Sequence, residues 1–167
     1  MRLPDHLMFW AACSLGYFGF LCTSELTVPS LASFSPSLHF GVQDIAMDSL
    51  PAPSCLCLKI KGKKTDLFKK AAFIYIGLGR PPLCAIHLVI TYIASSGDLP
   101  DSLFLFKIGL LLSCTLFMDC LRQILASANV LCEFSSHSFR IGTATVAVRN
   151  GVPNRLIQAR PLVEFRL

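Results

Sequence analysis

The sequence predicts an α+β fold that is mainly helical and carries a small three-stranded antiparallel sheet. An apolar stretch at 7–21 is long enough for a buried helix, three short β-type segments lie within 42–77, and helical spacing with capping residues follows residue 81. The chain has 167 residues, which fits one domain, 1–167, and is too short for two comfortable domains.

The first half of the chain supplies one helix and the sheet. Asp5 is a candidate N-cap of a helix that runs to about Ser24, and this helix is apolar on nearly all sides, so we expect it to be central. The strands are predicted at 42–50, 54–60 and 71–77, with a polar turn at 61–66 between the last two. In the second strand, alternation places Cys55, Cys57 and Lys59 on one face.

The second half reads as helices. Pro81-Pro82 opens a helix that extends to about Ser96, and 103–106 is a short strand or a buried turn. Ser113 caps a helix to about Ala128. Ser135 or Ser136 caps the next helix, from His137 to about Asn150, which Gly151 ends in a left-handed conformation. Pro153 begins a last short helix that Pro161 stops.

The formal net charge is +5, and the basic residues fall into two clusters. Six lysines lie between 59 and 70 with only Asp66 to oppose them, and five arginines follow His137 with only Glu164. Two basic clusters separated by apolar sequence suggest two patches that converge on one polyanion.

The eight cysteines lie mostly inside apolar runs and lack zinc-finger spacing, so we expect buried free thiols and no metal site. Hydrophobic residues make up 53% of the chain and the mean hydropathy is +0.60, which keeps open an alternative, a small membrane or secreted protein with an N-terminal hydrophobic segment. The segment 7–21 is shorter than the roughly 20 residues of a spanning helix and has the length of a signal-peptide core. Its preceding residues, with Arg2 offset by Asp5, suit a signal peptide poorly.

The segment 134–140, Phe-Ser-Ser-His-Ser-Phe-Arg, places a histidine and an arginine at the start of a predicted helix. His137 and Arg140 are separated by three positions, so they share one face of the first turn. Arg140 would meet a phosphate as a forked double donor and His137 as a donor or base. This arrangement suits the binding of a phosphodiester, although an isolated His-x-x-Arg motif is weak.

The surrounding sequence makes the motif more specific. Residues 137–159 read HSFRIGTATVAVRNGVPNRLIQA, which resembles the catalytic domain of tyrosine recombinases of the phage-integrase type. It is especially similar to those of eukaryotic tyrosine-recombinase retrotransposons. Residues 21–26 and 63–66 fall where that family has Leu-Arg-x-x-Glu and Ser-Lys-Thr-Asp, and the resemblance covers about 7–159.

The resemblance implies roles for individual residues. His137, Arg140 and the hairpin lysine Lys64 are implied as catalytic residues, with Lys63 a weaker substitute for Lys64, and Glu25 as a structural acid. Cys22 stands where the family has its first catalytic arginine. No tyrosine follows Arg140 in this sequence, where the family's nucleophile lies, so we expect that the C-terminal tyrosine segment is absent. We also expect that the family's N-terminal core-binding domain is absent.

The functional expectation is a DNA-binding remnant of a mobile-element recombinase, tied by family to DNA integration and recombination but inactive in strand cleavage. Lys61, Lys63, Lys64 and Arg140 are the expected DNA contacts. We expect no cofactor, no membrane association, a nuclear or cytoplasmic location without secretion, and a homo-oligomer on DNA by analogy with the family.

Overall fold

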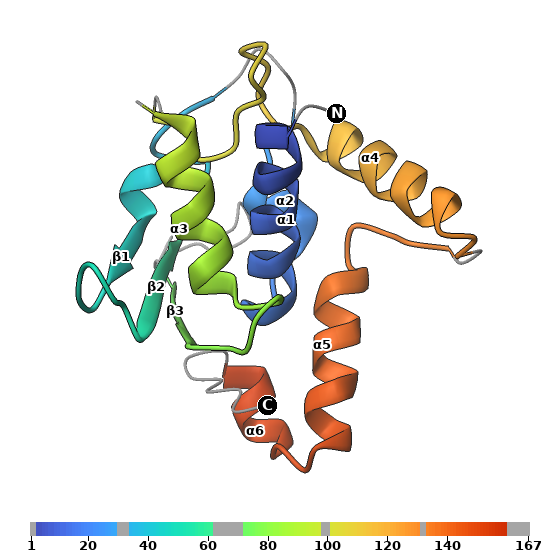
Figure 1. The fold of residues 1–167 in the computed structure, drawn as a ribbon. Helices are drawn as coiled ribbons and strands as arrows, with labels where there is room; N and C mark the ends of the chain where they lie inside the picture. Colours follow the sequence, from blue (N-terminus) through green and yellow to red (C-terminus); the bar gives the residue numbers. More distant parts are fainter. Residues whose placement is uncertain (1–2, 30–33, 62–71, 98–100, 131–132, 160–167) are drawn as a thin grey trace.

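The computed structural model describes residues 3–29, 34–61, 72–97, 101–130 and 133–159. A central helix, α1 (Leu3–Phe18), is flanked by helices and by one sheet at the side (Figure 1). The other helices are α2 (Thr23–Leu26), α3 (Ala85–Ser96), α4 (Cys114–Ser127), α5 (Ser138–Arg149) and α6 (Asn154–Ala159). The predicted α+β class with a small antiparallel sheet is confirmed.

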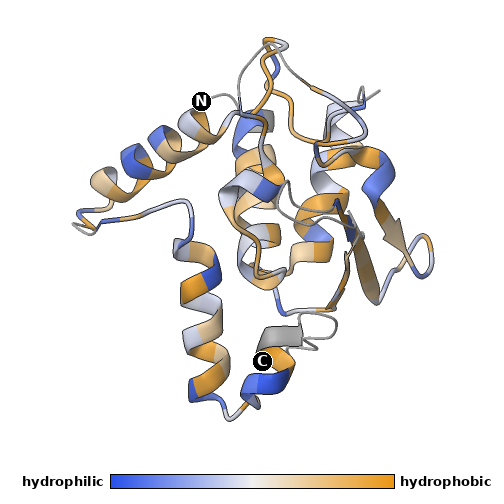
Figure 2. Ribbon diagram, turned by 180° about the vertical axis from the view of Figure 1, so that it is seen from behind, coloured by the Kyte–Doolittle hydropathy of each residue, from blue (hydrophilic) through white to orange (hydrophobic). Residues whose placement is uncertain are grey.

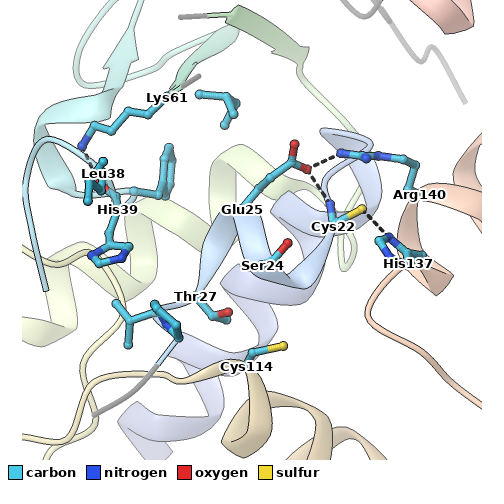
Figure 3. A pocket seen from close by; sticks show the side chains of 14 residues that line it. Cys22, Ser24, Glu25, Thr27, Leu38, His39, Lys61, Cys114, His137 and Arg140 are labelled. Carbon is cyan, nitrogen blue, oxygen red and sulfur yellow. Dashed lines mark hydrogen bonds and ion pairs between the residues drawn. The ribbon is translucent and has the colours of Figure 1, made fainter. Parts of the chain in front are cut away.

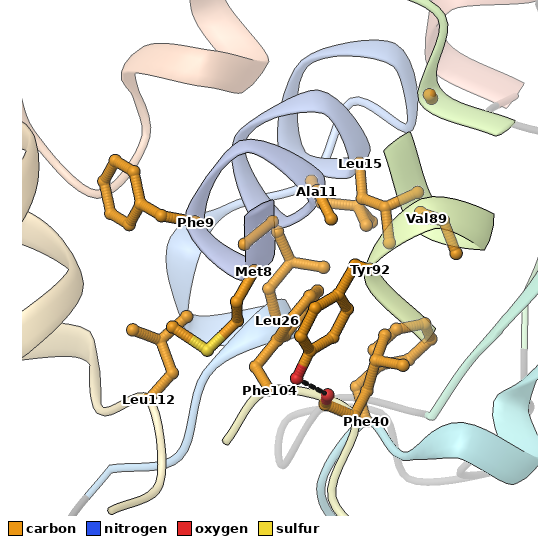
Figure 4. Packing of buried hydrophobic residues seen from close by; sticks show 14 of the residues in the cluster. Met8, Phe9, Ala11, Leu15, Leu26, Phe40, Val89, Tyr92, Phe104 and Leu112 are labelled. Carbon is orange, nitrogen blue, oxygen red and sulfur yellow. Dashed lines mark hydrogen bonds between the residues drawn. The ribbon is translucent and has the colours of Figure 1, made fainter. Parts of the chain in front are cut away.

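Helix α1 packs mainly against α3 and also contacts α5 (Figure 1). Met8, Ala11 and Leu15 are fully buried, as expected for a helix that is apolar on nearly all sides. They pack with residues from α3 and from the 103–112 segment, including Val89 and Tyr92 (Figure 4). The prediction that this first helix is central is therefore confirmed.

Two details of the predicted first helix are wrong. The helix ends at Phe18 rather than near Ser24, because Phe20 adopts a positive φ of 53° and reverses the chain. Asp5 lies inside the first turn and is not the N-cap. Its carboxylate accepts a hydrogen bond from the Lys107 backbone N–H at 2.9 Å, so it ties α1 to a distant loop.

The sheet has the order β1-β2-β3, with β1 (Ile45–Met47), β2 (Cys55–Ile60) and β3 (Ala72–Gly77) all antiparallel. In β2, Leu56, Leu58 and Ile60 are buried while the alternate positions face outward, which confirms the predicted faces. The strands and central helices are largely hydrophobic, whereas α4 and α5 mix both kinds of residue (Figure 2).

The first strand is shorter than predicted. A 3-10 turn occupies Val42–Asp44, because the Asp44 carboxylate accepts a hydrogen bond from the Gly41 N–H at 2.8 Å and curls the chain. After β1, the Asp48 carboxylate accepts hydrogen bonds from the N–H groups of Ser49, Ser54 and Cys55 and closes the turn into β2. The side-chain hydrogen bond from Ser54, followed by those backbone bonds, holds the pKa of Asp48 below its usual value.

The later helices follow the sequence signals with small shifts. Helix α3 starts at Ala85 rather than at Pro81-Pro82, with Cys84 in an extended conformation as its N-cap. Ser113 caps α4 as predicted and accepts from the Leu116 N–H at 3.2 Å. Helix α5 starts one residue late, with His137 as its N-cap, and Gly151 has the predicted left-handed φ of 77°. The predicted stop at Pro161 and the turn at 61–66, beyond Lys61, lie outside the described residues.

Candidate functional site

The candidate site lies where the start of α5 meets the loop between α1 and α2. The Thr23 N–H donates to the Ser136 carbonyl at 2.9 Å, and the Thr143 hydroxyl donates to the Tyr17 carbonyl at 2.7 Å. Phe139 packs edge-on against Phe117, with ring centroids 5.8 Å apart. These contacts fix the start of α5 against α1, α2 and α4, so side chains more than 100 residues apart in sequence face one another.

Glu25 is the centre of the polar contacts. Its Oε2 atom accepts a hydrogen bond from the Cys22 backbone N–H at 2.8 Å and forms an ion pair with the Arg140 guanidinium. The Arg140 Nε–H donates to the Phe20 carbonyl at 2.8 Å. The side chains of Arg140 and Glu25 are 22% and 10% exposed, so the pair is only partly screened by water. Glu25 therefore holds both the backbone of Cys22 and the head of Arg140.

Cys22 and His137 form a second contact beside the ion pair. The Cys22 Sγ atom lies 2.9 Å from His137 Nδ1, and both side chains point toward each other (Figure 3). Cys22 is 2% exposed, whereas His137 is exposed on its other side. The structure thus brings together four residues that the sequence singled out, namely Cys22, Glu25, His137 and Arg140.

A pocket of about 650 Å³ opens beside this cluster. Arg140 and His137 lie at one end, and Lys61 and His39 lie at the other, with Glu25 and Cys22 between them (Figure 3). Ser24 and Cys114 also line the pocket. Sequence patterns gave no signal for His39, Ser24 or Cys114, because tertiary packing alone places them at this wall.

Lys61 has a role inside the protein. Its ammonium group pairs with the Asp44 carboxylate at 2.5 Å and donates to the His39 carbonyl at 2.5 Å and to the Pro36 carbonyl. Its side chain is 14% exposed. Asp44 therefore offsets this charge and Lys61 ties together three segments of the chain, while its contact with DNA stays a prediction. Lys63 and Lys64 lie outside the described residues.

Other predicted features have simple outcomes. The described cysteines form no disulfide, but the expectation that they are buried holds for Cys22 and Cys84 and not for the others, which are only partly buried. Within the described ranges, no group of three or more His, Cys, Asp or Glu side chains is arranged to hold a metal ion. None of the helices in the described part of the chain is long and apolar enough to cross a membrane.

Comparison with known proteins supports the fold. No protein-family model and no curated protein sequence matches the chain. Among solved structures, the site-specific recombinase XerH, crystallised with its difH substrate in a pre-cleavage complex, is similar with a TM-score of 0.65. The similarity covers 96% of this chain and 41% of the XerH chain, at 17% sequence identity. The chain therefore has a fold like that of a site-specific recombinase, over about two fifths of the length of XerH.

Proposed function

We propose that this protein binds DNA by holding a backbone phosphate in the pocket beside Arg140 and His137, and that it does not cleave the strand. The observation that carries the proposal is the placement of Arg140 and His137 together at one end of a 650 Å³ pocket in a recombinase-like fold. The recombinase XerH is itself bound to its difH substrate, which supports DNA as the ligand class.

Arg140 is suited to meet a phosphate because its position is fixed. A guanidinium has five N–H donors in a planar fork. Nε and Nη2 bind Phe20 and Glu25, while Nη1 has no acceptor among the residues that the structure describes. Glu25 acts as a positioning residue, since it holds the fork at the pocket wall and removes part of the entropic cost of ordering it.

His137 adds a second group at the same end of the pocket. Its ring is exposed at the N-cap of α5 and is held from behind by Cys22. A protonated imidazole is a donor to a phosphate oxygen, and a neutral one accepts or donates through its Nε2 atom. The two groups together suit the binding of one phosphate of a nucleic acid backbone.

Cys22 is the reason for proposing binding without cleavage. The resemblance implies an arginine here, and a thiol offers one weak donor where a guanidinium offers five. Loss of a single donor that stabilises transition-state charge typically lowers the rate about 10²- to 10³-fold. We therefore propose an inactive descendant of a mobile-element recombinase, of the retrotransposon type, in which Lys63 and Lys64 supply further backbone contacts.

Binding is tested by fluorescence anisotropy with a labelled duplex of about 20 base pairs. We expect a sequence-tolerant Kd in the range of about 10⁻⁴–10⁻⁶ M that weakens as salt rises. Arg140→Gln should weaken binding about five- to thirtyfold, which corresponds to about 1–2 kcal/mol, and lower the salt slope by about one. Arg149→Gln is the matched control, because Arg149 is an exposed arginine on the same helix and its loss changes the net charge equally.

Equal losses in the two variants, or no binding by the folded wild-type protein, would contradict the phosphate site. Arg140→Lys is a second variant that keeps the charge and the ion pair with Glu25 but loses the fork, so we expect a loss of binding several times smaller than that of Arg140→Gln. Cleavage is tested separately with a nicked suicide duplex and denaturing gels. A covalent protein–DNA adduct in the wild-type lane would show that the proposal of an inactive protein is wrong.

A further inference from the structure

We propose that Cys22 and His137 form a nucleophilic thiol–imidazole pair, and that Cys22 is a site of reversible covalent modification by small disulfides. The contact between the Cys22 sulfur and the His137 imidazole nitrogen carries this proposal (Figure 3). The proposal does not depend on DNA binding. It concerns the reactivity of one thiol, which can be measured without nucleic acid.

The geometry is that of a nucleophile beside its base. Sγ of Cys22 and Nδ1 of His137 are 2.9 Å apart, within the distance over which a proton passes between them. With the ring proton on Nε2, Nδ1 is the acceptor of the thiol proton. The exposed edge of the ring lets water stabilise the imidazolium that results.

Hydrogen bonds fix the backbone on both sides of the Cys22–His137 contact. Glu25 fixes the Cys22 backbone N–H at 2.8 Å, and Ser136 accepts from the Thr23 N–H at 2.9 Å. Ser135 Oγ also accepts from the His137 N–H, at 3.3 Å. The charges that flank the pair, Glu25 on α2 and Arg140 on α5, form an ion pair and largely offset each other. Among these three side chains, the imidazole is the one in contact with the thiol.

Access distinguishes Cys22 from a buried structural cysteine. Cys22 and Cys84 are each 2% exposed. Cys22 lines the 650 Å³ pocket, whereas Cys84 packs inside the hydrophobic core cluster. We therefore expect a reagent in the pocket to reach Cys22 with a smaller opening of the fold than Cys84 requires.

The reaction balances without any further oxidant. The thiol proton passes to His137 Nδ1, and the Cys22 thiolate attacks one sulfur of the disulfide. A new S–S bond forms at Cys22 as the bond within the reagent breaks, and the leaving thiolate takes that electron pair and the proton from the imidazolium. Cys22 is oxidised and half of the reagent is reduced. A thiol in excess reverses the step.

The size of the effect follows from the thiolate fraction. An ordinary protein thiol is about 3% thiolate at pH 7. Complete transfer of the proton to imidazole raises this fraction up to about 30-fold, and the lower basicity of such a thiolate cancels part of the gain in rate. We expect a net acceleration of about three- to tenfold over an unassisted thiol at pH 7.

The test uses the full chain and 4,4′-dithiodipyridine, with absorbance for the total rate and peptide mass spectrometry for each site. We expect Cys22 to react at least about ten times faster than Cys84, and His137→Gln to slow Cys22 about three- to tenfold. His87→Gln is the control, since His87 is exposed on α3 and does not line the pocket. Cys84 reports unfolding in every variant, because it becomes reactive only when the core opens.

A Cys22 rate equal to that of Cys84 in the wild-type protein overturns the proposal, as does an unchanged Cys22 rate in folded His137→Gln. Should that variant unfold, the pH profile of the wild-type protein decides. An ordinary thiol loses about 75-fold in thiolate fraction between pH 8 and pH 6, and N-acetylcysteine serves as the reference. We expect Cys22 to lose less than about tenfold relative to pH 8. A loss parallel to that of N-acetylcysteine overturns the assignment.

Discussion

The ion pair between Arg140 and Glu25 ties the last described helices to the first ones, so its removal should be measurable in stability. Arg140→Gln loses the pair and the hydrogen bond from Nε to the Phe20 carbonyl. The side chains are 22% and 10% exposed. The cost therefore lies between the 0–1 kcal/mol of a surface pair and the 3–5 kcal/mol of a fully buried one, at about 2 kcal/mol.

The bond to Phe20 adds about 1 kcal/mol, which gives a total loss of about 3 kcal/mol. For a chain of this size the corresponding fall in Tm is about 6–12 °C. Urea unfolding followed by circular dichroism measures the free energy, and calorimetry measures Tm. Both measurements need no ligand, so they test the structural role of Arg140 separately from its proposed role in phosphate binding.

A double-mutant cycle isolates the pair itself. Glu25→Gln keeps an acceptor for the Cys22 N–H but removes the charge, and the double variant Glu25→Gln with Arg140→Gln completes the cycle. We expect the sum of the two single losses in unfolding free energy to exceed the loss in the double variant by about 1–2 kcal/mol. Each single variant leaves one partly buried charge without its partner. Additivity within about 0.5 kcal/mol would refute the coupling.

Three further predictions concern the scaffold. Tyr92→Phe should lose about 1–2 kcal/mol of unfolding free energy in urea. The reason is that the buried Tyr92 hydroxyl donates to the Leu103 carbonyl at 2.8 Å and accepts from the Leu105 N–H (Figure 4). The control is Tyr75→Phe, at a side chain 41% exposed, which should change stability by less than about 0.5 kcal/mol. Ser113→Ala should cost about 1 kcal/mol through loss of the α4 cap, with the exposed Ser127→Ala as the neutral comparison. Burial, reinforced by Cys120, raises the pKa of the Cys13 thiol to about 12. The contribution of the protonated Cys13 thiol to stability is therefore full below pH 9 and declines as the pH rises toward 12. Iodoacetamide at pH 8 should label Cys13 far more slowly than it labels N-acetylcysteine. Labelling at the same rate would contradict this.

Much of the fold was predictable because its signals are local. Alternation in 55–60 and the caps at Ser113 and Gly151 each depend on a few neighbouring residues. The end of α1 was not predictable, since the apolar run continues through Leu21 with only Gly19 to interrupt it. The reversal at Phe20 is held by Arg140, which lies 120 residues away. A long-range hydrogen bond of this kind leaves no trace in a short sequence window.

The candidate site shows the same division. The spacing of His137 and Arg140 predicted a shared face, and the structure places both at one end of the pocket. The lysine cluster gave no sign that the Lys61 ammonium pairs with Asp44, a partner that only the fold brings near, and its contact with DNA stays a prediction. Cys22 appeared in the sequence as the loss of an arginine. Its contact with His137 gives that position chemistry of its own, which composition alone could not indicate.

The proposed function requires that a DNA phosphate occupies the pocket end formed by Arg140 and His137. The most direct measurement is the ¹H–¹³C NMR spectrum of the imidazole groups during titration with the labelled duplex, because the chain has only four histidines. We expect the ring signals of His137 to shift in a saturable manner, while those of His87, which is exposed on α3, stay in place. Saturable DNA binding that leaves the His137 signals unmoved would contradict it.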